Sequence, residues 1–223
     1  MKKKTKIVLI CLSGFVLTLA LVVAIPFSIM GAKSASMDKD YTYLKTDVTY
    51  SQKVEVEGVN LVKQHVSCGY ASIEMLSEFY GKKVSEDDLD AKNKGGVSTA
   101  STDGFLKEIN ASISSKEFVK KTYLTNDNYL KEIHDSLKNN NPVAIEWAAK
   151  YEDEWTLHFS VVSGLDIAND NVTILNPYGY IENIKVDEFI DRTTFKAYKN
   201  LPLFLNFGFA FGAFDKNALF YAK

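Results

Sequence analysis

The residues best suited to chemistry surround Cys68, in the polar turn Gln-His-Val-Ser-Cys-Gly-Tyr-Ala-Ser at positions 64–72. Apolar residues then recur at three- and four-residue steps until Gly81, so Cys68 is predicted at or just before the first turn of a helix. Unpaired backbone N–H groups and the positive end of the helix dipole stabilise a thiolate at that position. Because a thiolate attacks carbonyl carbon, Cys68 is a candidate nucleophile for acyl transfer, with Gly69 keeping the approach to sulfur open.

Acyl transfer by a thiol also needs a base and donors for the oxyanion. His158 lies in an apolar run at 157–165 that is typical of a buried strand, and Asn176 closes the next predicted strand at 172–176. In a hairpin or meander, the start of one strand lies beside the end of the next, so Asn176 could orient the His158 ring. The side-chain amide of Gln64 could donate to an oxyanion beside the backbone N–H of Cys68.

These positions also predict an ionised pair. An imidazolium at His158 and the helix start would both depress the pKa of the Cys68 thiol, so the thiol should be alkylated faster than a model thiol at mildly acidic pH. The simpler interpretation of Cys68 is a small core residue at a helix start.

Three segments together resemble papain-like peptidases related to bacteriocin double-glycine leader peptidases. They are Gln-x-x-x-Ser-Cys-Gly-Tyr-Ala from Gln64, His-Phe-Ser-Val-Val-Ser-Gly-Leu-Asp from His158, and Asn-Pro-Tyr-Gly-Tyr from Asn176. The resemblance spans residues 60–223 and implies Gln64 as oxyanion donor, Cys68 as nucleophile, His158 as base and Asn176 as orienting residue. Leader peptidases more often carry Asp as the third catalytic residue, where this sequence has Asn176, and they are usually fused to a transporter. The resemblance therefore does not imply their substrate for this chain. The papain pattern Cys-Gly-Ser-Cys-Trp is also absent.

The N-terminal segment, residues 1–36, is predicted to be a membrane anchor or a signal peptide. Four lysines among the first six residues precede an uncharged apolar stretch at 7–30, which is long enough to cross a bilayer. The expected orientation places these lysines on the cytoplasmic side of the membrane and the domain on the other side. Small residues around 32–34 offer a cleavage site, so the alternatives are a single-pass membrane protein with an extracellular domain and a secreted, processed form. Cys11 is interpreted as an ordinary membrane-embedded residue, which leaves Cys68 without a disulfide partner.

The remaining chain predicts one domain of the α+β class, a papain-like fold with a helical N-terminal half packed on an antiparallel sheet. Residues 37–59 form a spacer that becomes an edge strand near 54–56, and residues 60–223 form the peptidase domain. After the Cys68 helix, Ser85 with Asp88 predicts a capping arrangement, and Thr102 or Asp103 is expected to cap a third helix. A fourth helix is predicted at 127–138, followed by strands at 143–148, 157–165, 172–175, 181–186 and 218–222.

Two other stretches have open interpretations. The acidic and aromatic loop at 150–155 would either line a substrate cleft or form a solvated hairpin turn. The aromatic stretch at 201–211 would either pack in the core or form a patch for a hydrophobic substrate, a partner or the membrane surface. His65 is expected to be structural, and His134 is expected to be a solvated residue on the fourth helix.

Composition narrows the function. The net charge of −2 argues against a nucleic-acid partner, and the sequence shows no nucleotide-binding glycine motif, zinc-ligand spacing or calcium loop, so neither cofactor nor metal is expected. The favoured hypothesis is an extracytoplasmic cysteine peptidase, or another thiol-dependent acyl-transfer enzyme, that acts on a peptide or protein through a Cys68 thioester. The alternative is a non-catalytic peptide-binding or immunity-type module on the same fold.

Overall fold

A seven-stranded antiparallel sheet forms the centre of the protein. The structure is a computed structural model, and it describes residues 3–196 and 203–223. Six strands follow the order β2-β7-β3-β4-β5-β6, and β1 pairs with β4 beside that path. The strands are β1 (Val54–Glu55), β2 (Phe118–Lys121), β3 (Val143–Tyr151), β4 (Glu154–Asp166), β5 (Asn171–Asn176), β6 (Tyr180–Ile184) and β7 (Leu219–Ala222).

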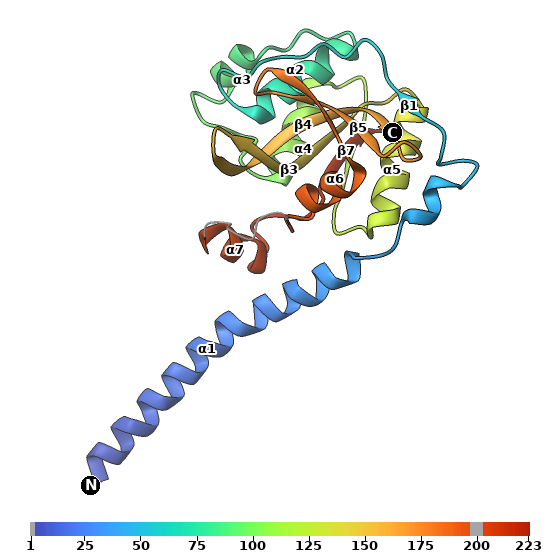
Figure 1. Ribbon diagram of the computed structural model, residues 1–223. Coiled ribbons are helices and arrows are strands. Elements are labelled where there is room, and N and C mark those ends of the chain that lie inside the picture. Colours follow the sequence, from blue (N-terminus) through green and yellow to red (C-terminus); the bar gives the residue numbers. More distant parts are fainter. Residues whose placement is uncertain (1–2, 197–202) are drawn as a thin grey trace.

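Helices cover both faces of this sheet, and one long helix leaves the domain (Figure 1). They are α1 (Lys3–Met37), the short 3-10 helix η1 (Thr42–Lys45), α2 (Cys68–Phe79), α3 (Glu86–Lys92), α4 (Thr102–Ser112), α5 (Asn126–Lys138), α6 (Val186–Thr193) and α7 (Leu203–Ala210). The apolar faces of α2 and α4 share one core cluster with Phe159 and Val161 of β4, whereas α5 and α6 share another with Ile145 and Trp147 of β3. The central strands β3 and β4 therefore bury side chains in two different cores, one on each face of the sheet.

The α+β class is confirmed, and so are the five strands expected in the second half, apart from their ends. Val186 was expected to end a strand but begins α6, because the chain turns after β6 and the apolar positions then follow a helical period. The capping box of Ser85 and Asp88 is confirmed. The cap of α4 is Ser101, whose Oγ accepts from the Gly104 backbone N–H, so the expectation of Thr102 or Asp103 was wrong by one or two residues.

His134 corrects another expectation, because it is buried rather than solvated. It lies on α5 among charged residues, but its own side of the helix faces Tyr50, whose ring meets the imidazole edge to face at 5.1 Å between centroids. The segment before the domain folds back over α5, a contact between residues far apart in sequence that composition did not reveal.

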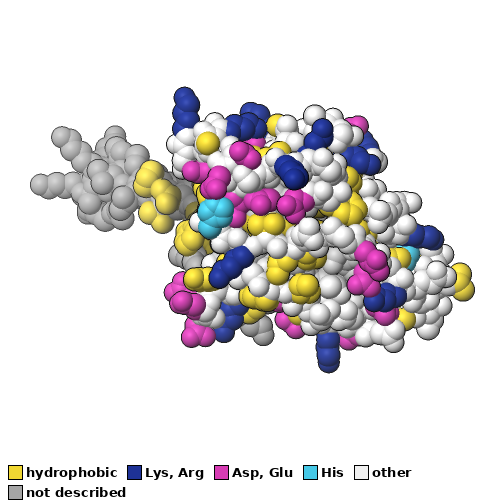
Figure 2. Space-filling view, turned by 90° about the horizontal axis from the view of Figure 1, so that it is seen from above, with side chains coloured by type: hydrophobic (Ala, Val, Ile, Leu, Met, Phe, Trp, Pro, Cys, Tyr) yellow, Lys and Arg dark blue, Asp and Glu magenta, His cyan; other side chains and the backbone are white. Residues whose placement is uncertain are grey.

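The helix α1 is long and apolar enough to cross a membrane, judged by length and composition. On the domain face seen in Figure 2, several acidic side chains lie in a row beside one histidine, and basic side chains lie around them. Of the aromatic stretch at 201–211, residues 201 and 202 lie outside the described residues, and the rest forms α7 and the turn after it.

Candidate active site

Cys68 is the first residue of α2, as its sequence predicted. Ser67 precedes it with an extended backbone, and its Oγ accepts a hydrogen bond from the Tyr70 backbone N–H at 3.1 Å. This cap fixes where the helix begins and places the sulfur among the first, unpaired N–H groups of the helix.

The turn before Cys68 is held by Glu86, a residue that the sequence did not single out. Its buried carboxylate accepts from three successive backbone N–H groups, those of His65 at 3.1 Å, Val66 at 2.9 Å and Ser67 at 2.9 Å. The exposed His65 ring contacts the carboxylates of Glu86 and Asp87. The hydrogen bond to Asp87 is the main reason that the pKa of the imidazole is raised, and the charge of Glu86 adds to it. His65 therefore has the structural role expected of it.

Gly69 is required for a different reason from the expected one. A Cβ at this position would lie 2.2 Å from Oγ1 of the buried Thr99. The loop at 95–99 also receives a hydrogen bond from the Tyr70 hydroxyl to the Gly96 carbonyl at 2.7 Å. The glycine thus allows this loop to pack directly on the start of α2, rather than opening a path to sulfur.

His158 and Asn176 lie side by side, as the order of the strands predicted, with His158 Nε2 2.8 Å from Asn176 Oδ1. The amide is fixed in this orientation, because Oδ1 also accepts from the Tyr178 backbone N–H at 2.9 Å and Nδ2 donates to Glu182 at 2.6 Å. Since Oδ1 can only accept, Nε2 of His158 carries the proton. In the neutral ring, Nδ1 is then the basic nitrogen.

Behind Asn176, two charged residues continue the network. Arg192 Nη1 donates to Glu182 at 2.7 Å, and its Nε donates to the Ala148 carbonyl at 2.7 Å. The guanidinium also lies 3.6 Å from the ring centroid of Trp147. Arg192 is buried, so its position is fixed by these contacts, and it in turn holds the carboxylate that orients Asn176.

Cys68 and His158 are linked in space through Phe159 and Tyr178. Cys68 packs against the cluster that contains Phe159, the residue next in sequence to His158, and the Phe159 backbone N–H acts to lower the pKa of the thiol. The Tyr178 ring stacks on the His158 ring at 4.0 Å between centroids. Burial raises the pKa of the Tyr178 phenol, and the charge of a Cys68 thiolate would raise it further. None of the hydrogen bonds between described residues joins the Cys68 sulfur to the imidazole directly.

The electrostatics favour neutral forms of both groups. Burial raises the pKa of the Cys68 thiol to about 11, against the opposing effect of the Phe159 backbone N–H. The buried carboxyl of Glu146 raises it further. Burial lowers the pKa of His158 to about 4, although the hydrogen bond to Asn176 acts in the other direction. Both shifts run against the expected thiolate–imidazolium pair and favour a neutral thiol beside a neutral imidazole.

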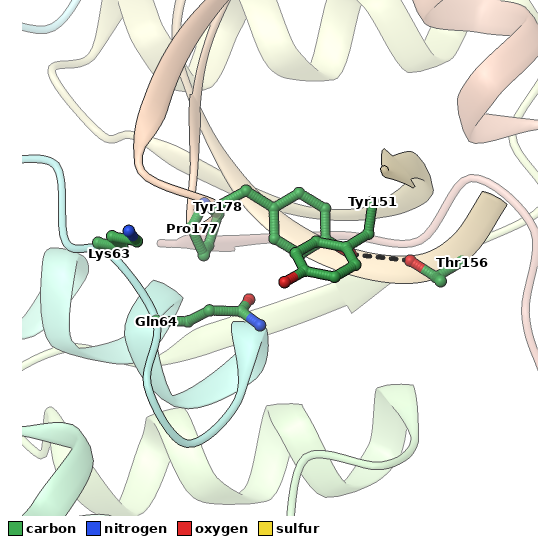
Figure 3. Close-up of a pocket in the computed structure, with 6 residues that line it drawn as sticks. All are labelled: Lys63, Gln64, Tyr151, Thr156, Pro177 and Tyr178. Atoms are coloured by element: carbon green, nitrogen blue, oxygen red, sulfur yellow. Dashed lines mark hydrogen bonds between the residues drawn. The ribbon is translucent and has the colours of Figure 1, made fainter. Parts of the chain in front are cut away.

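A cleft of about 280 Å³ lies beside these residues, lined by Lys63, Gln64, Tyr151, Thr156, Pro177 and Tyr178 (Figure 3). The Gln64 backbone N–H donates to the Pro177 carbonyl at 2.7 Å, which ties the turn before Cys68 to the turn after Asn176. The Gln64 side chain points into the cleft, and the Tyr178 hydroxyl meets that of Thr156 at 2.9 Å. Among the described residues, no cluster of three His, Cys, Asp or Glu side chains is arranged to bind a metal ion.

Alkylation of Cys68 tests the neutral pair. In a Cys11→Ala background, the rate with iodoacetamide should be slower than that of a model thiol at pH 6 and should rise continuously with pH toward 11, because only the thiolate reacts. Tyr178→Ala should speed labelling at pH 7 by admitting water to the sulfur. Fast labelling that is independent of pH between 5 and 7 would instead show an ion pair.

A family model described as Peptidase_C39 like family matches residues 50–202. Among solved structures, the chain is similar to the peptidase domain of Streptococcus ComA, a bi-functional ABC transporter involved in a quorum sensing pathway, with 16% identity and a TM-score of 0.47. That match covers 74% of this chain and 98% of the other. The search of curated proteins found no match.

Proposed function

The chain belongs to the Peptidase_C39 like family, and from this premise we propose that it is an extracytoplasmic cysteine peptidase that cleaves peptide or protein substrates through a Cys68 thioester. The observation that carries the proposal is the His158–Asn176 hydrogen bond, because it leaves Nδ1 as the base on β4, the strand whose Phe159 belongs to the cluster against which Cys68 packs. A non-catalytic binding module would not need a histidine held in one tautomer.

In the proposed reaction, His158 Nδ1 takes the thiol proton as sulfur attacks the substrate carbonyl carbon. The Cys68 backbone N–H and the Gln64 amide donate to the oxyanion. The tetrahedral intermediate collapses to a thioester when the C–N bond breaks, and the imidazolium gives its proton to the leaving amine. Water, deprotonated by the same imidazole, then attacks the thioester carbonyl carbon. The C–S bond breaks, the acid is released, and the imidazolium returns its proton to the Cys68 sulfur. Neutral resting forms suit this sequence, since the proton moves only during attack.

Glu182 and Arg192 are proposed as positioning residues for this base. Glu182→Ala should lower kcat with little change in KM, because Asn176 would lose the acceptor that orients its amide. Glu182→Gln, which keeps an oxygen able to accept, should restore most of the rate. Equal losses of kcat in both variants, or losses that follow thermal stability alone, would contradict the positioning role.

The proposal for α1 is that it remains uncleaved as a membrane anchor and holds the domain outside the cytoplasm. Its support is the lysine-rich start followed by an apolar helix with exposed side chains, including Leu17, Leu21 and Ile25. Secretion after cleavage near residues 32–34 is the other outcome. Mass spectrometry of the protein recovered from membranes and medium distinguishes them.

The activity itself is tested with a peptide library. The full chain carrying Cys11→Ala is incubated with the library before and after complete alkylation of Cys68 by iodoacetamide. Cleavage products that vanish on alkylation are expected. Products that persist unchanged would exclude a thiol mechanism, and no products with either sample would favour the binding module.

A further inference from the structure

The helix α7 presents aromatic side chains to the outside of the molecule. It contains no charged residue, and Phe204 and the following Phe211 are 68% and 53% exposed. Its opposite side is fixed to the domain through Phe209, whose ring lies 4.7 Å from that of Phe195 and 5.7 Å from that of Phe214. The exposed rings therefore belong to an anchored helix and the turn directly after it, which makes them a fixed feature of the surface.

This helix also contacts α1. The rings of Phe27 on α1 and Phe207 on α7 meet edge to face at 5.2 Å between centroids. Met30 of α1 packs against the cluster that contains Phe209. Figure 1 shows α7 on the side of the domain from which α1 departs. The two helices thus form a continuous apolar surface.

The position of Phe27 along α1 sets the depth of α7. Residues 7–32 are uncharged, a length of about 39 Å at a rise of about 1.5 Å per residue, which exceeds a hydrocarbon core of about 30 Å. Lys33 is the first charge after this stretch, and its Nζ lies over the Tyr123 ring of the domain. Phe27 is then about 9 Å deeper than Lys33 along the helix axis. Interfacial helices bury their apolar faces by about 5–10 Å, so Phe207 lies at the same depth as theirs.

We propose that α7 inserts into the bilayer leaflet on the domain side, with Phe204 and Phe211 in contact with lipid acyl chains. This inference rests on the part of the proposed function in which α1 is a retained anchor. We assign lipid as the partner of this surface, because the surface of α7 continues directly from the α1 residues whose exposed side chains would face the bilayer. On the domain side, the ion pair of Lys196 with Asp38 at 2.8 Å lies where water is available.

The active site is attached to this membrane contact. Trp155 and Leu157 of β4 pack against the cluster that holds α7, and Thr156 between them lines the cleft. His158 follows on the same strand. The cleft is therefore held close to the lipid surface, and the substrate class that fits is a polypeptide segment lying at that surface.

Spin labels test the insertion in the full chain, reconstituted in vesicles of phosphatidylcholine and phosphatidylglycerol. Cys11→Ala and Cys68→Ala remove the native thiols, and labels are placed singly through F204C, F211C, L21C and V97C. L21C is the control within the span, and V97C is an exposed apolar position in the loop before α4. The ratio of collisions with oxygen to collisions with a water-soluble nickel chelate should be several-fold higher at F204C and F211C than at V97C, and should approach the ratio at L21C.

The outcomes separate the inference from its premise. Nickel access at F204C and F211C equal to that at V97C, with L21C protected, would overturn insertion and leave the anchor intact. Protection of both labels from oxygen as well as nickel would mean protein contact, such as a second copy, and would also overturn it. Nickel access at L21C would remove the anchor itself. The proposed nucleophile is missing from this Cys68→Ala background, so the spin-label measurements leave the peptidase proposal to be tested by the library digestion.

Discussion

Cys68→Ala should abolish amide hydrolysis, with a loss on the order of 10⁶ in kcat, while the domain folds with nearly unchanged stability. The substitution removes the proposed nucleophile but only one heavy atom, so the free energy of unfolding should change by no more than about 1 kcal/mol. The cap of α2 is made by Ser67 and the preceding turn by Glu86, and neither contact involves the sulfur. Library digestion and thermal unfolding measure the two effects on the same sample.

Cys11→Ala is the matched control, because it removes the other thiol of the chain from a segment outside the domain. It should leave hydrolysis unchanged. If Cys68→Ala yields the same products as the wild type, the peptidase proposal is contradicted. A loss of activity accompanied by a large fall in unfolding temperature would instead assign Cys68 to the core.

The parts of the site that could be predicted from sequence depend on local rules. The start of α2 follows from a capping serine and the helical period after it, and the pairing of His158 with Asn176 follows from two strands joined in a meander. Glu86, Glu182 and Arg192 could not be predicted in this way. Their partners lie 6 to 44 residues away in the chain, where only the folded structure places them.

The Cys68 thiol shows why a rule based on local sequence can predict the opposite direction for a pKa shift. A helix start stabilises an anion by about 0.3–1 kcal/mol, which is less than one pKa unit. Full burial shifts a pKa by as much as 3–5 units toward the neutral form. At Cys68 the larger effect is burial, which includes packing against the cluster that contains Phe159 and Val161 of β4, and this contact cannot be inferred from the residues around the cysteine.

His158→Ala should cost about as much activity as Cys68→Ala, because the nucleophile and its base act as one unit. The double variant with Cys68→Ala should therefore show no further loss. The substitution leaves a space beside the Tyr178 ring, which now stacks on the imidazole. Added imidazole should occupy it and restore part of the rate, whereas a merely structural loss would not be reversed in this way.

The pH profile of the wild type gives the matching result. The base must be neutral to accept the thiol proton, and burial lowers the pKa of His158 to about 4. Activity, measured as kcat/KM, should therefore hold as pH falls through 6.5 and decline only near pH 4. His65→Ala is the control, since that exposed histidine titrates on the turn before Cys68 without being the proposed base. It should keep the acid limb in place. A limb that moves with His65 rather than His158, or a His158→Ala variant with wild-type turnover, would contradict the assignment of the base.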